Sequence, residues 1–157
     1  MTQTLIALSY WLHSLATVVL IGHYLLLAIL YLPAMRKSSL EVTGPILSDI
    51  SRHSRRWMYA SLVIFTLTGI YLMFLDPNYF GVGDFRNFWS IMMLIKHLLI
   101  VGMLAAGFWF NAFLRVGPML SSRNSAEQAY ARFRLFVNIM AVSGVLVLLL
   151  TALAQIQ

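Results

Sequence analysis

The chain has 157 residues, of which 61% are apolar and only 10% are charged, and its mean hydropathy is +0.82. A soluble domain has about 25% charged residues, so this composition excludes a water-soluble globule and indicates an integral membrane protein. The chain contains no cysteine, which excludes disulfides, thiolate metal sites, iron–sulfur clusters and cysteine nucleophiles.

The lengths of the apolar stretches predict how the chain crosses the membrane. A spanning helix needs about 20 predominantly apolar residues, because the hydrocarbon core is about 30 Å thick. The stretches that satisfy this requirement are residues 5–34, 57–75, 88–114 and 135–154. The sequence therefore predicts an all-α fold, an integral membrane four-helix bundle, with residues 1–157 forming a single transmembrane domain.

The residues that precede the first two stretches indicate where those helices begin. Residues 5–34 lack a basic segment before them and are longer than the apolar part of a secretory signal, so we expect a retained helix. Pro45 precedes a polar segment that leads into residues 57–75, and proline is well suited to the start of a helix. We therefore expect the second helix to extend beyond the bilayer.

The distribution of lysine and arginine predicts the orientation. Most of these residues lie in the first and third connections, whereas the second connection has Arg86 alone and neither terminus has any. By the positive-inside rule the first and third connections are cytoplasmic, and both termini are on the outer, periplasmic side of the inner (plasma) membrane. The net charge of +6 then faces anionic lipid rather than a nucleic acid.

Ionisable residues at membrane depth are costly and therefore suggest function. Within the predicted spans these residues are His13, His23, Lys96 and His97, and no Asp or Glu occurs there. Proton relays and ion-coupled transporters usually carry an intramembrane carboxylate, so the sequence disfavours those classes.

Counting residues from the outer ends of the helices compares the depths of the histidines. His13 and His97 are each roughly nine residues, or about 13 Å, from the outer start of their helices. We therefore expect the two imidazoles to lie level and to face each other across the bundle. His23 is ten residues after His13, so the two cannot bind one metal ion; His23 could serve a second site or replace one of the pair.

Small residues on the other two helices gather at this depth, including Gly69 and Gly144. They allow close helix packing, or they leave room for a flat and bulky group. Two level histidines beside small residues match a b-type haem with bis-imidazole ligation. In this interpretation His13 and His97 bind the iron, and Lys96 or Arg86 balances a propionate. Copper bound by His13, His97 and methionines is the alternative.

Several fixed residues resemble the copper-resistance D (CopD) type of membrane domain. The resemblance covers nearly the whole chain, and its residues are Trp11, Leu12, His13, Gly22, Pro33, Thr68, Gly69, Lys96 and Asn111, followed by residues 132–154. That family is associated with copper uptake across the inner membrane, so the resemblance implies copper uptake or transfer.

A more distant resemblance is to the HemJ-type protoporphyrinogen oxidase, a four-helix membrane protein that binds haem b. The matching residues are His13 in the first helix and Lys96 in the third. This resemblance implies a haem-dependent oxidoreductase acting on a porphyrinogen. The function expected first is electron transfer by bound haem, with a redox partner or a larger membrane complex; copper transfer and porphyrinogen oxidation are the alternatives.

Overall fold

The computed structural model describes residues 2–35, 40–81, 87–113 and 123–155. These residues form helices and short turns and contain no strand, which confirms the predicted all-α class. The helices are α1 (Thr2–Leu26), the π-helical segment η1 (Leu27–Tyr31), α2 (Leu32–Met35), α3 (Leu40–Leu75), α4 (Phe88–Phe113) and α6 (Arg123–Ala154).

Within the described residues, four helical stretches are long and apolar enough to cross a membrane, and they are Gln3–Met35, Pro45–Leu75, Phe88–Trp109 and Glu127–Ala154. Their outward faces carry large apolar side chains; Val18 is 68% exposed, Ile29 is 70% exposed and Trp57 is 72% exposed. Exposed apolar surface of this extent is suited to lipid rather than to water. The predicted multi-pass membrane architecture is therefore confirmed at the level of helix number, length and composition.

Two of these helices extend well beyond their apolar stretches. α3 begins at Leu40, ahead of Pro45, and α6 begins at Arg123, whereas the apolar runs begin at residues 57 and 135. An apolar run marks only the part of a helix that lies in hydrocarbon. The polar residues before these runs continue the same helices toward the membrane surface.

The first spanning helix changes its hydrogen-bond pattern at η1. The N–H of Leu32 donates to the carbonyl of Leu27, five residues earlier, and the next residue is Pro33. Proline has no N–H, and its ring crowds the carbonyl four residues before it, so the wider π-helical turn relieves this crowding. The hydroxyl of Tyr130 on α6 donates to the carbonyl of Leu32 at 3.2 Å, which ties α6 to this irregular turn.

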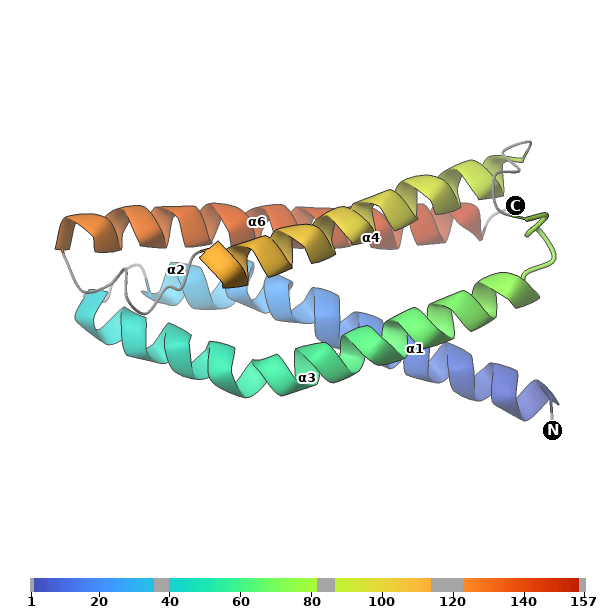
Figure 1. The fold of residues 1–157 in the computed structure, drawn as a ribbon, viewed down its shortest axis with the longest axis horizontal. Coiled ribbons are helices and arrows are strands. Elements are labelled where there is room, and N and C mark those ends of the chain that lie inside the picture. The colour runs from blue at the N-terminus through green and yellow to red at the C-terminus, as the bar shows by residue number, and fades with distance from the viewer. Residues whose placement is uncertain (1, 36–39, 82–86, 114–122, 156–157) are drawn as a thin grey trace.

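The helices associate as two pairs, α1 with α3 and α4 with α6, and α1 also packs on α6. Figure 1 shows both chain ends at one end of the bundle, where the α1–α3 pair diverges from the α4–α6 pair. The opposite end holds α2 and the starts of α3 and α6. We call these the terminal end and the connection end.

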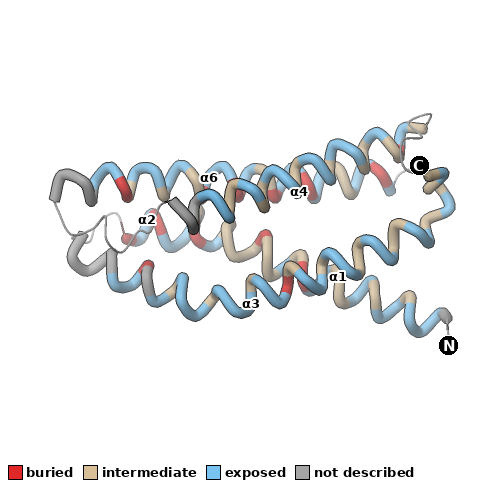
Figure 2. The backbone as a smooth tube through the Cα atoms, viewed as in Figure 1, coloured by how far each residue is buried: buried red, intermediate tan, exposed pale blue. Residues whose placement is uncertain are grey.

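The best-packed core lies toward the connection end. Leu27, Leu32 and Val137 form a buried cluster, and Tyr130 and Phe136 pack against it. Figure 2 shows buried positions where the second half of the first spanning helix meets α6, and few along α4. The candidate ligands His13, Lys96 and His97 all lie outside this cluster.

Candidate functional site

The imidazole of His13 on α1 is held by α3. Its Nδ1 lies 3.0 Å from Oγ1 of Thr68, and its ring stacks on the ring of Phe65 with centroids 4.4 Å apart and an interplanar angle of 21°. His13 is half-buried, so these contacts fix an imidazole inside the membrane-spanning part of the bundle.

Thr68 and Gly69 allow the ring to approach α3 closely. A Cβ atom added to Gly69 would lie 3.1 Å from Cε1 of His13 and 3.6 Å from Nδ1. The shorter of these distances is tighter than ordinary van der Waals contact. The sequence suggested that Gly69 leaves room for a flat group, and the flat group in contact with it is the His13 imidazole. Phe65, Thr68 and Gly69 share one face of α3 because they are spaced by three and four residues.

Lys96 is a half-buried cation on α4. An electrostatic interaction links it to His13 on α1. Among the described residues, the only ion pair joins Asp49 and His53 on α3. Lys96 therefore has no carboxylate partner in the described part of the chain, which is unusual for an ammonium group at membrane depth.

His97 lies next to Lys96 in sequence but on a different side of α4. Successive residues of a helix point about 100° apart; His97 is exposed, and its Nδ1 donates to the carbonyl of Met93 at 2.6 Å. In the described contacts the His13 ring meets Phe65, Thr68 and Gly69, and none joins it to His97. His13 and Lys96 are thus both half-buried, whereas His97 lies on the exposed flank of the same turn of α4 as Lys96.

His23 belongs to different surroundings. Its ring meets Tyr24 edge-on at a centroid distance of 5.4 Å, and Tyr24 in turn meets Phe136 at 6.1 Å. Phe136 packs on the buried cluster toward the connection end. The ten residues between His13 and His23 correspond to about 15 Å of helix, so the structure does not bring these two histidines together.

Gly144 allows contact between α1 and α6. A Cβ atom there would lie 2.9 Å from Cγ2 of Ile21, so the space beside Gly144 is filled by an α1 side chain. Arg86, the other predicted cation on the outer side, lies outside the described residues.

A groove of about 310 Å³ runs between α4 and α6. Ser143 contributes the one hydroxyl to an otherwise apolar lining that includes Leu99, Met103 and Met140. Its volume is at the lower end of the range for small-molecule sites, about 300–1,000 Å³.

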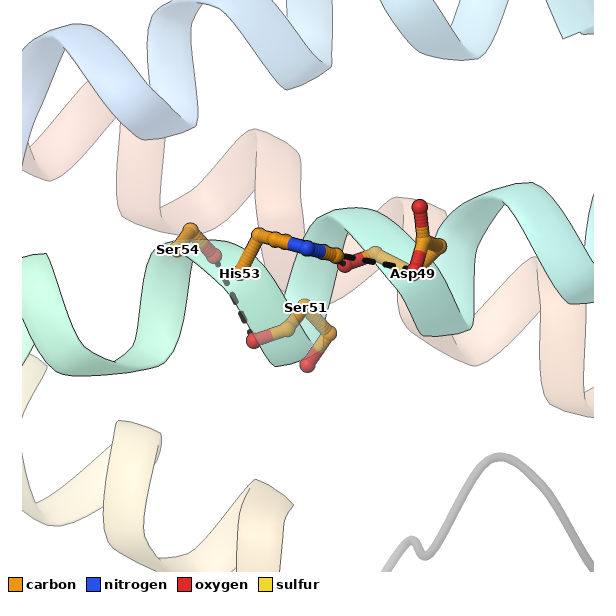
Figure 3. A network of polar contacts seen from close by, with 4 residues as sticks. All are labelled: Asp49, Ser51, His53 and Ser54. Carbon is orange, nitrogen blue, oxygen red and sulfur yellow. Dashed lines mark hydrogen bonds and ion pairs between the residues drawn. The ribbon is translucent and has the colours of Figure 1, made fainter.

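His53 provides a contrast with the intramembrane histidines. It is exposed on α3, where its Nδ1 lies 3.0 Å from the carbonyl of Asp49 and 3.3 Å from the Asp49 carboxylate. Ser51 and Ser54 complete this polar surface of α3 (Figure 3). An exposed pair of this kind contributes little to stability, and His53 is therefore a suitable control for the other histidines.

The described residues contain no cluster of three or more His, Cys, Asp or Glu side chains placed to hold a metal ion. The site instead consists of one oriented imidazole, one nearby ammonium and one exposed imidazole. Such a set can supply axial nitrogen ligands to a metal that brings its own equatorial ligands, as haem does, and a cation for an anionic group.

Comparison of the chain with protein-family models, with curated proteins and with solved structures found no match.

Proposed function

We propose that this protein is a multi-pass membrane protein that binds b-type haem within its helical bundle and transfers electrons. His13 and His97 would hold the haem iron, and Lys96 would neutralise a propionate. The bound haem would accept and release one electron at a time by cycling between ferric and ferrous iron. The residues of the chain would hold the haem and balance its charge.

The observation that carries the proposal is the hydrogen bond at Nδ1 of His13. A metal-ligating histidine almost always donates its other ring N–H to an acceptor, which orients the ring. Thr68 occupies that place at 3.0 Å, and Phe65 stacks on the ring. His13 therefore has the support expected of a ligand that binds through Nε2.

The geometry of His97 is compatible with the second ligand role. Its Nδ1 is engaged by the carbonyl of Met93 at 2.6 Å, which again leaves Nε2 for a metal. His97 and Lys96 are consecutive on one turn of α4, so one segment presents both a ligand and a cation at nearly the same depth.

Lys96 supports haem over a ligand without charge. An ammonium group in hydrocarbon needs a partner, and the described part of the chain offers it no carboxylate. Haem carries two propionates, so it can supply the missing anion. We further propose that both termini face the periplasm across the inner membrane, and that electrons pass to a redox partner or a larger membrane complex.

A spectrum of the protein purified after expression with haem supply tests the proposal. We expect a Soret band and, after reduction, the sharp α and β bands of low-spin bis-imidazole haem. His13→Ala should abolish these bands, whereas His53→Ala should retain them, because His53 is exposed on α3.

Other spectra would contradict parts of the proposal. A His13→Ala protein with its full haem content would exclude His13 as a ligand. Loss of low-spin character in His23→Ala but not in His97→Ala would move the second ligand to His23. A colourless wild-type protein that retains copper after dialysis would replace haem by copper, and consumption of protoporphyrinogen by the haem-loaded protein would indicate an oxidase.

A further inference from the structure

Thr68 lies where it can determine which nitrogen of His13 is available to a ligand. Its Oγ1 is 3.0 Å from Nδ1 of His13, 2.6 Å from the carbonyl of Ile64 and 3.3 Å from the carbonyl of Phe65. A threonine hydroxyl has one proton to donate and lone pairs with which to accept. The three neighbours therefore compete for a single proton.

The Thr68 hydroxyl donates its hydrogen bond to the carbonyl of Ile64. A carbonyl oxygen can only accept a hydrogen bond, and the Ile64 carbonyl is the neighbour nearest to Oγ1. The Phe65 carbonyl can likewise only accept from this hydroxyl. Thr68 thus has no proton left for His13 and must act as the acceptor. It follows that Nδ1 of His13 carries the hydrogen, and that in the neutral ring Nε2 carries the lone pair.

We propose that Thr68 is a positioning residue that holds His13 in the Nδ1–H tautomer and presents Nε2 as the ligand atom. The stacked ring of Phe65 and the close approach at Gly69 restrict rotation about the same side chain. The ligand is thereby oriented before anything binds. The part of this inference that concerns haem rests on the proposed function, whereas the tautomer does not.

Nitrogen NMR of the haem-free protein in detergent, labelled with ¹⁵N-histidine and kept at mildly alkaline pH, tests the tautomer directly. The His13 signals are assigned by their loss in His13→Ala. We expect a protonated Nδ1 and an unprotonated Nε2 in the wild type and in Thr68→Ser, which keeps the hydroxyl. Thr68→Val removes the acceptor and should give a mixture of tautomers.

Thr66→Val is the matched control. Thr66 lies on the same helix and bonds its own backbone at Leu62, but it is exposed and its hydroxyl makes no contact with His13. Its removal should leave the His13 signals unchanged. A wild-type ring protonated at Nε2, or the same tautomer in wild type and a folded Thr68→Val, would overturn the inference; the wild-type measurement decides even if Thr68→Val does not fold.

Haem binding provides a second readout that a purely structural role would not change in this pattern. Loss of the hydrogen-bond partner of a ligating histidine typically weakens metal binding about 10–100-fold. We therefore expect the haem Kd to rise by that factor in Thr68→Val and to remain unchanged in Thr66→Val. The midpoint potential should become more positive, because an Nδ1–H that donates no hydrogen bond makes Nε2 a weaker base.

The two proposals fail separately. If the wild type binds no haem, the proposed function is wrong and the tautomer measurement still stands. If haem binds but Thr68→Val leaves both its affinity and its potential unchanged, Thr68 does not position the ligand.

Discussion

The connection end and the terminal end of the bundle use the same helices in different ways. Toward the connection end, Leu27, Leu32 and Val137 are buried together, and the hydroxyl of Tyr130 joins α6 to the π-helical turn. Toward the terminal end the helix pairs diverge (Figure 1), and the contacts are polar and specific, centred on His13. This difference predicts that the connection end contributes more to stability than the surroundings of His13 do.

Leu27→Ala should cause the largest loss of stability among these variants, and it tests whether the connection end stabilises the bundle. Leu27 is 4% exposed in the buried cluster, and truncating a buried leucine typically costs about 2–5 kcal/mol. We expect a loss of about 2 kcal/mol, at the low end, because a leucine that leaves this core in a membrane still lies in lipid. The measurement is the unfolding free energy in mixed micelles, with the NMR signals of His13 unchanged.

The neighbouring residue supplies the control for this prediction. Leu26 is 52% exposed, so Leu26→Ala should change stability by less than about 0.5 kcal/mol. Equal losses in the two variants would mean that the connection end is not the stabilising region.

Gly144→Ala tests the contact that joins the helix pairs. The new methyl group would lie 2.9 Å from Cγ2 of Ile21, and overpacking of this kind costs about 1–3 kcal/mol. We expect a loss of about 1.5 kcal/mol in unfolding free energy. Gly22→Ala on α1 should be tolerated, since a Cβ atom there has no neighbour within 4 Å. Adding Ile21→Ala should restore part of the loss; no restoration would contradict the contact.

Tyr130→Phe should have a smaller effect. It removes only the hydroxyl that donates to Leu32 at 3.2 Å, and hydrogen bonds between membrane helices average about 0.6 kcal/mol. Tyr59→Phe, at an exposed position, is the control. A loss in Tyr130→Phe no larger than in the control would show that the π-helical turn does not depend on α6.

Gly69→Ala should have the smallest effect on stability among these variants and the largest effect on the orientation of the His13 ring. The added methyl group would meet the edge of the His13 ring at 3.1 Å, and we expect a rotation of that ring with a change in unfolding free energy below about 0.5 kcal/mol. The expected results are shifted His13 signals and a rise of about tenfold in the haem Kd.

Gly102→Ala, where a Cβ atom would have no neighbour within 4 Å, is the matched control for this change. Unshifted His13 signals in Gly69→Ala would mean that α3 does not constrain the ring. A large loss of stability would instead place a structural contact at the terminal end.

Counting residues along each helix predicted the depth of the site residues but not the direction of their side chains. Depth counted from the helix ends put His13 level with His97, and Lys96 differs from His97 by only about 1.5 Å of rise. Counting could not supply the rotation of each side chain about its helix axis: in the structure Lys96 is half-buried and His97 is exposed. Likewise, Gly69 and Gly144 were recognisable as small residues at a useful depth, but their contacts with His13 and Ile21 could not be read from spacing along one helix.

The sequence by itself determined that the chain is helical and has stretches long and apolar enough to cross a membrane, because run length and charge content are properties of the chain that need no neighbour. It also marked the costly residues at membrane depth. Only the tertiary structure decided which side of each helix meets another, since a change of one position turns a side chain by about 100°. The pairing of His13 with Thr68, and the role this assigns to Nε2, follow from that rotation.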